Sequence, residues 1–317
     1  MKRFLSLATA LCLLLGLCSF AAAEGDEPLR VVALKGPTAM GMVKLMSEED
    51  PAYAFEIVSD ITMVTPMVAR GEVDIAAVPA NVAAVLYNNP DVDVQVLCVN
   101  TLGVLYIVEN GDTVHSVEDL KGRTIYASGA GATPEYALNY ILSANGIEDV
   151  NVEWKSEHTE CLSALLADEN GIAMLPQPFV TTALMKNENL RVALSLTDEW
   201  NALQAGSETP SAMVTGVLIV RHAYAEAHPD KVNAFMDAYA ASVEWVNANV
   251  DEAAALVGGY DIVPEAVARQ AIPACNIVCI RDEELVAALG GYLTVLFEQN
   301  PRAVGGAVPG EDFWYAR

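Results

Sequence analysis

Short apolar runs alternate with helix-like segments along most of the chain, and this alternation allows few folds. Leu29–Leu34 is followed by a small polar turn and a helical pattern, and so is Val73–Val78. Strands that alternate with helices form βαβ units around a mostly parallel sheet. The sequence therefore predicts an α/β fold, and its 317 residues suggest about two domains.

The stretch 121–140, KGRTIYASGAGATPEYALNY, carries a local pattern that implies a ligand. Arg123–Ala127 is typical of a short buried strand, and residues 128–132 are too small to continue it. Thr133 as the N-cap and Pro134 as the first helical residue are the expected start of a helix. Such a turn presents N–H groups at the positive end of a helix dipole, where polar or anionic groups bind.

A tight turn without a ligand is an equally good interpretation of this stretch. It contains neither GxxxxGK[ST] nor GxGxxG, so it does not imply a nucleotide. However, three loops of the chain share the geometry, because each follows a predicted strand and precedes a predicted helix: residues 35–39, 79–81 and 128–133. Ligands of parallel sheets bind beyond the carboxyl ends of the strands, so we expect these loops to meet at one site.

The charge balance argues against several classes of partner. The chain has 17 basic and 42 acidic residues and a formal net charge of −25. A surface this acidic repels phosphate backbones and anionic lipids, so we expect no nucleic-acid binding. The four histidines lie far apart, and the sequence contains neither CxxC nor HExxH. We therefore expect no metal and no cofactor.

Residues 1–23 have the pattern of a secretory signal: a basic start at Lys2 and Arg3, an apolar stretch, and a small-residue cleavage site at 21–23. We expect an exported, periplasmic or cell-surface protein. Two alternatives are an uncleaved anchor and lipid attachment at Cys18, although the preceding Leu15-Gly16-Leu17 places Leu where a lipid-attachment motif prefers Gly, Ala or Ser.

The cysteines that remain after cleavage are too few and too scattered for a disulfide framework. Two of them, Cys275 and Cys279, could form a bridge or could be small buried apolar residues, and we favour the second interpretation. The remaining two are Cys98 and Cys161.

Five stretches, in this order, resemble the solute-binding proteins of ABC importers. The resemblance is to the type II periplasmic-binding fold, in the NMT1/THI5-like branch that includes nitrate, sulfonate, taurine and thiamine-precursor binders. Singly each stretch is a weak signal, but together they are specific and cover nearly all of the mature chain: ARGEVDIAAVPAN (69–81), VEDLKGRTIYASGAGATPEYALNYIL (117–142), GIAMLPQPFVTTAL (171–184), and the segments 214–257 and 298–315.

The resemblance implies two α/β lobes that close on a ligand by a hinge. The first lobe would comprise residues 29–102 plus 214–317, and the second residues 103–213. The chain would cross between them near 101–103 and 211–215. The resemblance also implies the cleft residues, which are Lys35, Gly36, Pro37, Thr38, Asn81, Thr101, Gly129, Ala130, Ala132, Thr133, Gln177 and Thr215.

Each of these assignments has a simpler alternative. Lys35 could be a solvated surface residue. Asn81 and Thr133 would be helix caps first and ligand donors second. Gln177 stands where relatives often have an acidic residue, which puts a charge-pairing role in doubt.

The expected function is that of a non-catalytic, monomeric receptor. It would capture a small solute, with a slight preference for an oxyanion, sulfonate or carboxylate over a neutral heteroaromatic ring, and deliver it to a membrane permease with its ATPase. One alternative is an enzyme on the same fold, acting in thiamine-pyrimidine or futalosine-type metabolism. Such an enzyme needs a positioned acid, base or nucleophile. The other alternative is an exported sensor or adhesion module.

Overall fold

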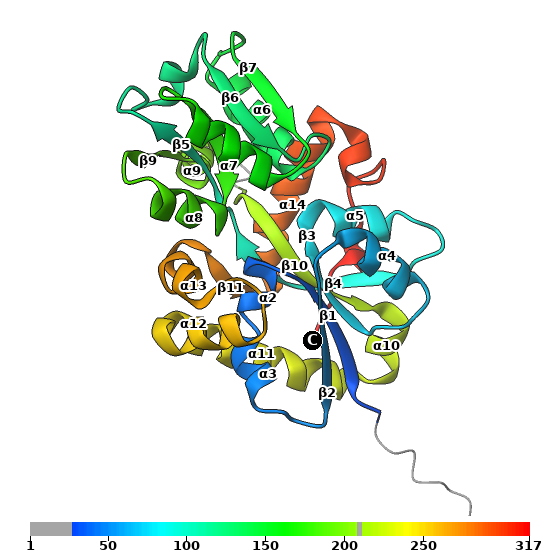
Figure 1. Cartoon of the computed structure of the whole chain (residues 1–317). Helices are drawn as coiled ribbons and strands as arrows, with labels where there is room; N and C mark the ends of the chain where they lie inside the picture. The colour runs from blue at the N-terminus through cyan, green and yellow to red at the C-terminus, as the bar shows by residue number, and fades with distance from the viewer. Residues whose placement is uncertain (1–26, 208–210) are drawn as a thin grey trace, which may run out of the picture.

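The computed structural model describes residues 27–207 and 211–317, and their strands form two sheets (Figure 1). The predicted signal segment 1–23 lies outside the described residues. The first sheet has six strands in the order β11-β4-β10-β3-β1-β2. The second has five strands in the order β7-β6-β8-β5-β9.

In the first sheet, β1 to β4 run in one direction. This follows because β1 pairs in parallel with β2 and β3, while β10 lies antiparallel between β3 and β4. β11 is antiparallel to β4. The carboxyl ends of four strands therefore share one edge. The strands are β1 (Leu29–Leu34), β2 (Tyr53–Val58), β3 (Ile75–Pro79), β4 (Val94–Leu102), β10 (Val214–Arg221) and β11 (Ile277–Ile280).

In the second sheet, β5 runs against the other four strands. β6 pairs in parallel with β7 and β8, and β5 lies antiparallel between β8 and β9. The two sheets are thus mixed but mostly parallel in strand direction, as predicted. The strands are β5 (Leu105–Asn110), β6 (Thr124–Ser128), β7 (Asn151–Lys155), β8 (Ile172–Pro176) and β9 (Leu190–Ser195).

Helices follow most strands of both sheets. Those in the segments that build the first sheet are α2 (Pro37–Met40), α3 (Val43–Ser47), α4 (Ile61–Ala69), α5 (Ala80–Tyr87), α10 (His222–Ala227), α11 (Pro229–Ala248), α12 (Val250–Gly259), α13 (Glu265–Ala271) and α14 (Asp282–Gln299). Those between strands of the second sheet, or directly after its last strand, are α6 (Thr133–Ala144), α7 (His158–Ala167), α8 (Phe179–Lys186) and α9 (Leu196–Gln204). Short 3₁₀ turns complete the list: η1 (Val117–Leu120), η2 (Ile272–Ala274), η3 (Pro301–Val304) and η4 (Glu311–Phe313).

The helical pattern that follows the strand Leu29–Leu34 is interrupted, because α2 ends before Gly41 and α3 begins after it. A side chain at Gly41 would lie 2.8 Å from the hydroxyl oxygen of Tyr239. The glycine therefore lets this segment approach α11 closely. This tertiary contact, rather than helix propensity, decides where the two short helices lie.

Helix α14 connects the two sheets on one side of the molecule (Figure 1). It contacts α5 beside the first sheet and α6 beside the second. The fully buried Trp200 of α9 lies with its ring centroid 5.2 Å from Tyr292 of α14 and 4.4 Å from Tyr140 of α6. One continuous apolar cluster therefore runs through both sheets at this side.

The chain passes from the first sheet to the second between Leu102 and Leu105, and returns at Val214. The predicted boundaries of the lobes themselves stay a prediction. The C-terminal segment 303–317 packs on the body, because Phe313 is fully buried and Tyr315 N–H donates to the Val96 carbonyl at 3.0 Å.

The four cysteines of the described residues are free thiols. Cys279 lies beside Cys98 of the neighbouring strand β4, and its pKa is lowered by a hydrogen bond with Cys98 and by Arg281. Burial raises the pKa of Cys98 and Cys161, and raises that of Cys275 to about 12.

A brief iodoacetamide pulse on the reduced, folded protein at pH 8 is therefore expected to label Cys279 first. The thiolate is the reactive form, and Cys279 is the only one of these four thiols that is not fully buried. Peptide mass spectrometry measures the labelling. The Cys279→Ser variant should then label slowly, and preferential labelling of Cys161 or Cys275 would contradict this assignment.

Candidate functional site

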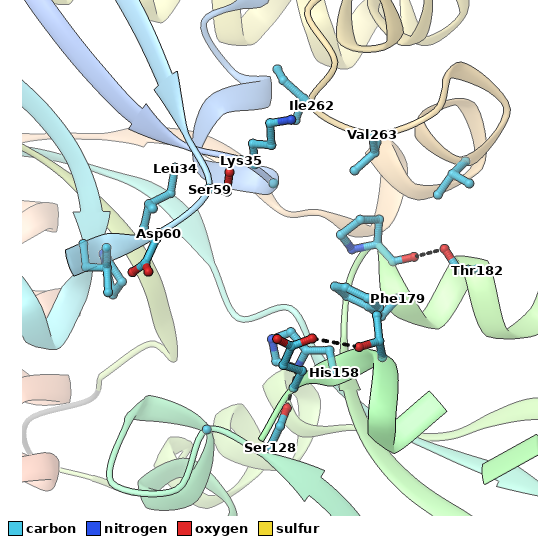
Figure 2. A pocket seen from close by; sticks show the side chains of 18 of the residues that line it. Leu34, Lys35, Ser59, Asp60, Ser128, His158, Phe179, Thr182, Ile262 and Val263 are labelled. Atoms are coloured by element: carbon cyan, nitrogen blue, oxygen red, sulfur yellow. Dashed lines mark hydrogen bonds between the residues drawn. The ribbon is translucent and has the colours of Figure 1, made fainter. Parts of the chain in front are cut away.

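The carboxyl ends of both sheets face one cleft of about 1020 Å³ (Figure 2). From the first sheet, residues 34–36 follow β1, residues 59–61 follow β2, and Pro79 ends β3. From the second sheet come residues 128–129 after β6, 156–159 after β7, and 178–179 with Thr182 after β8. Six strand ends thus converge on one space, as the carboxyl-edge rule predicts.

The loop between α12 and α13 forms a further wall of the cleft. It contributes Ile262, Val263 and Pro264, and Val267 follows from α13. α13 contacts α8 of the second sheet, so the cleft is bounded there by helices from both halves. Figure 2 shows Ile262 and Val263 on one side of the space and Phe179 facing them from α8.

The ammonium group of Lys35 forms an ion pair at the edge of the cleft. Its Nζ lies 2.7 Å from Oδ2 of Asp261, the residue before the apolar wall. Both side chains are well exposed, so the pair is weak in free energy terms. Hydrogen bonding and charge from Lys35 nevertheless lower the pKa of Asp261, which keeps the pair ionised at neutral pH.

A hydroxyl–imidazole pair lies on the opposite side of the cleft. Ser128 Oγ and His158 Nδ1 are 2.5 Å apart, and the Phe179 ring centroid lies 5.0 Å from the imidazole. Burial lowers the pKa of His158, against a smaller opposing effect of Glu157. The ring is therefore neutral at pH 7 and offers one donor and one acceptor nitrogen.

Three of the sequence-predicted site residues line this cleft: Lys35, Gly36 and Gly129. Gly129 has φ +89°, and an added Cβ would lie 2.7 Å from Cγ of Pro134, so glycine is required where the chain turns from β6 toward α6. Gly36, at φ +121°, has open space around it. Their role in binding stays a prediction.

Asn81 and Thr133 do not cap their helices. The N-caps are Pro79 for α5 and Ala132 for α6, so both residues stand inside the first turn, and the predicted capping roles are wrong. Instead, the Thr133 hydroxyl donates to Oδ1 of Asn81 at 3.1 Å. The two side chains thus join α5 to α6, and neither residue belongs to the cleft lining.

Other predicted site residues are engaged within the protein. The Thr38 hydroxyl donates to the Leu34 carbonyl at 3.0 Å, and Oε1 of buried Gln177 accepts from the Thr181 N–H and hydroxyl. Thr101 is fully buried, and its Oγ1 has no partner among the described residues. The cleft lining also excludes the remaining four, Pro37, Ala130, Ala132 and Thr215.

Sequence reasoning missed three of the segments that line the cleft. Two of them follow β2 and β7 and carry Asp60 and the segment 156–159, and both could have been found, because each follows a strand and precedes a helix. The wall from the α12–α13 loop had no such signal. It reaches the cleft only because the C-terminal third folds back beside the first sheet.

Two absences hold for residues 27–207 and 211–317. No helix there combines the length and apolar character that crossing a membrane requires. No group of three or more His, Cys, Asp or Glu side chains in those residues is arranged to hold a metal ion.

Comparisons with known proteins agree on one fold. A family model described as NMT1/THI5 like matches residues 54–253. Among solved structures, an ABC transporter protein from Parabacteroides distasonis is 23% identical, with a TM-score of 0.78 over 92% of this chain and 100% of that one. No curated protein matches the sequence.

Two further solved structures are sulfonate-binding proteins. The periplasmic aliphatic sulphonate binding protein SsuA from Escherichia coli is 16% identical, with a TM-score of 0.70 over 92% of both chains. The alkanesulfonate-binding protein SsuA from Xanthomonas axonopodis pv. citri, bound to MOPS, is 15% identical, with a TM-score of 0.62 over 90% of this chain and 95% of that one. At these identities the similarity shows the periplasmic-binding-protein fold.

Proposed function

The chain belongs to the NMT1/THI5-like family, and on this premise we propose that it is the solute-binding component of an ABC importer. One observation carries the proposal: six strand ends from two sheets converge on a single cleft of about 1020 Å³. Drug-sized and smaller ligands occupy spaces of this order, and loops at the carboxyl ends of strands are where α/β sheets bind them.

The proposal includes the two lobes and their motion. Residues 29–102 plus 214–317 would form one lobe and residues 103–213 the other, with a hinge at the two crossings. Helix α14 contacts both α5 and α6, and the Asn81–Thr133 hydrogen bond also joins α5 to α6. Different helices, α8 and α13, contribute residues to the cleft. Closing would change the width of the cleft while the packed side acts as the pivot.

We propose that the bound solute is not transformed. The Ser128–His158 pair is the feature that comes nearest to a nucleophile with its base. Within the described residues, however, no carboxylate or carbonyl group hydrogen-bonds the other ring nitrogen, which a base needs for orientation. Ser128 is also only 3% exposed. The pair is better suited to present a fixed polar surface to a ligand.

The proposed setting is outside the cytoplasm. The signal-like segment 1–23 supports export, and the ABC-transporter relatives support delivery to a membrane permease driven by an ATPase. We expect a monomer, because a receptor that closes around its ligand needs no partner subunit for binding.

A retention experiment tests the proposal. The mature chain is mixed with the small-molecule extract of a culture of its source organism, re-isolated and denatured, and the released compounds are identified by mass spectrometry. We expect one retained solute, recovered with unchanged mass. Binding should also reduce the radius of gyration in X-ray scattering, because the lobes close.

Two tryptophan variants provide the control. Ser59→Trp places an indole ring in the cleft from an exposed loop position, where it should compete with the solute for space and abolish retention. Ser143→Trp adds the same ring at an exposed position near the end of α6 and should leave retention intact. Retention that survives Ser59→Trp, or a solute converted to a product, would overturn the proposal.

A further inference from the structure

Two helix N-termini at the cleft already have an N–H group bonded to one of the protein's own side chains. A free helix N-terminus attracts an anion, because its first N–H groups lack partners and carry the positive end of the dipole. In α4 the Thr62 N–H donates to Asp60 at 2.8 Å, and in α8 the Thr181 N–H donates to Gln177 at 3.3 Å. Just before α6 and α7, the N–H groups of Gly131 and Ser156 donate to Glu135 at 2.5 Å and to Glu160 at 2.9 Å.

Carboxylates stand on both sides of the cleft. Asp60 lines it from the first sheet and Glu157 from the second. Asp60 accepts one N–H, and Glu157 accepts the Thr159 hydroxyl at 3.1 Å. An ionised carboxylate can accept about four hydrogen bonds, so both keep capacity for a ligand. An entering sulfonate or carboxylate would meet like charge from two directions.

The single ammonium group of the lining does not compensate for these carboxylates. Nζ of Lys35 lies 2.7 Å from Oδ2 of Asp261, so a solute anion would have to compete with a carboxylate that already contacts it, although this exposed pair is weak. The imidazole of His158 is neutral at pH 7, because burial lowers its pKa. Among the residues that line the cleft, the two carboxylates of Asp60 and Glu157 therefore outnumber the one ammonium group of Lys35.

The rest of the wall suits the body of an organic molecule. Phe179 faces the cleft beside His158, and Ile61, Ile262 and Val263 add apolar surface (Figure 2). The face of an aromatic ring attracts a cation, and the flanking apolar side chains accept hydrocarbon. The strongly acidic chain would also raise the local concentration of cations.

We propose that the solute of this cleft is a small organic cation, an amine or a protonated nitrogen heterocycle, whose positive nitrogen lies between Asp60 and Glu157 while its apolar part contacts Phe179. The inference rests on the proposed function, since it assigns the charge of the ligand of that same cleft. It is the opposite of the slight preference for an anion that the isolated Lys35 suggests.

Two series of matched compounds test which ligand charge the cleft prefers. Benzylamine, benzyl alcohol and benzenesulfonate vary the charge on one ring, and butylamine, butanol and butanesulfonate vary it on one chain. Binding to the mature protein is measured by saturation-transfer NMR and calorimetric titration at low and high salt. We expect each ammonium compound to bind about tenfold more tightly than its sulfonate, with the difference shrinking as salt rises.

Variants that remove the charge of one carboxylate test whether Asp60 and Glu157 bind the ammonium group. Asp60→Asn keeps a residue that can cap α4, and Glu157→Gln keeps the shape of the side chain. Each is expected to weaken ammonium binding by about threefold or more, since each removes one of the two partners of the cation. The exposed controls Asp91→Asn and Glu188→Gln remove the same charge away from the cleft lining and should change the affinity by less than about twofold.

The outcomes separate this inference from the function on which it rests. Three results would overturn the inference that the solute is a cation. They are tighter binding of the sulfonates, no detectable binding of the ammonium compounds, and equal effects of the cleft and control variants. A neutral or anionic solute from the retention experiment would overturn it as well, while leaving the receptor function in place. Only the failure to retain any solute would overturn that function. A retained solute with a positive charge, lost in Asp60→Asn and Glu157→Gln, would support the inference.

Discussion

Replacing Trp200 with alanine is expected to lower the free energy of unfolding by about 3–5 kcal/mol, the range for truncating a large buried aromatic side chain. Trp200 is fully buried between Tyr140 and Tyr292, with ring centroids 4.4 and 5.2 Å away. Its Nε1–H also donates to the hydroxyl of Ser211 at 3.1 Å. The substitution leaves a cavity where α6, α9 and α14 meet.

Removing the Trp200 side chain should have a second effect besides the lower free energy of unfolding, because of where the cavity lies. α14 belongs to the C-terminal segment, whereas α6 and α9 follow strands of the second sheet. Loosening their contact should also broaden the distribution of lobe orientations, which X-ray scattering of the free protein would detect. None of the residues that line the cleft lies in α6, α9 or α14.

Urea unfolding followed by far-UV circular dichroism measures the change in free energy. Trp200→Phe is the matched variant, because it refills part of the cavity and should recover about half of the loss. Trp154→Ala removes a half-buried tryptophan from β7 and should cost clearly less. A loss below about 1 kcal/mol for Trp200→Ala would mean that the packing described here does not stabilise the protein.

Replacing Asp74 with asparagine is expected to cost about 3 kcal/mol at pH 7, the lower end of the range for breaking a buried ion pair. The Asp74 carboxylate is 2% exposed and accepts from Arg30 Nη2 at 2.7 Å and from Arg221 Nη2 at 2.8 Å. It thereby joins β1 to β10 beside β3. Removing its charge leaves two guanidinium groups without their counter-ion, although their partial exposure to water limits the cost.

The pH dependence of this loss has a definite sign. Burial by itself would raise the pKa of Asp74, but the hydrogen bonds from Arg30 and Arg221 outweigh it and lower the pKa in the folded state. A lowered carboxyl pKa adds stability above the unfolded value of about 3.9, and this stability is lost as the pH falls through the folded value. The difference between wild type and Asp74→Asn should therefore be constant from pH 5 to 7 and shrink below about pH 4.

Urea midpoints at pH 7, 5 and 3 measure this difference. The exposed Asp91→Asn serves as the control for removal of one negative charge, and it should change the free energy of unfolding little at each pH. An Asp74→Asn difference that grows on acidification would contradict the assigned direction of the pKa shift.

Local sequence patterns were sufficient to determine the class of fold and the edge at which the site lies. The β-branched runs, the small turns and the helices that follow are short-range features, and the direction of parallel strands brings their carboxyl ends together without further information. For that reason the loops after β1 and β6 could be placed at the shared edge from the sequence, and they contain Lys35, Gly36 and Gly129, which the family resemblance named and which line the cleft. The same rule, applied to β2 and β7, would also have placed Asp60 and Glu157 there.

The hydrogen-bond and ion-pair partners of individual side chains were decided by the tertiary structure. Lys35 has its charge balanced by a residue 226 positions away, and Thr133 bonds to Asn81 rather than capping its helix. No local pattern encodes such partners, because they depend on how the C-terminal segment returns to the first sheet and on which faces α5 and α6 turn to each other. The sequence by itself therefore determined which ends of the strands face the cleft, whereas the partner of Lys35, the one ammonium group in the lining, was decided by a long-range contact.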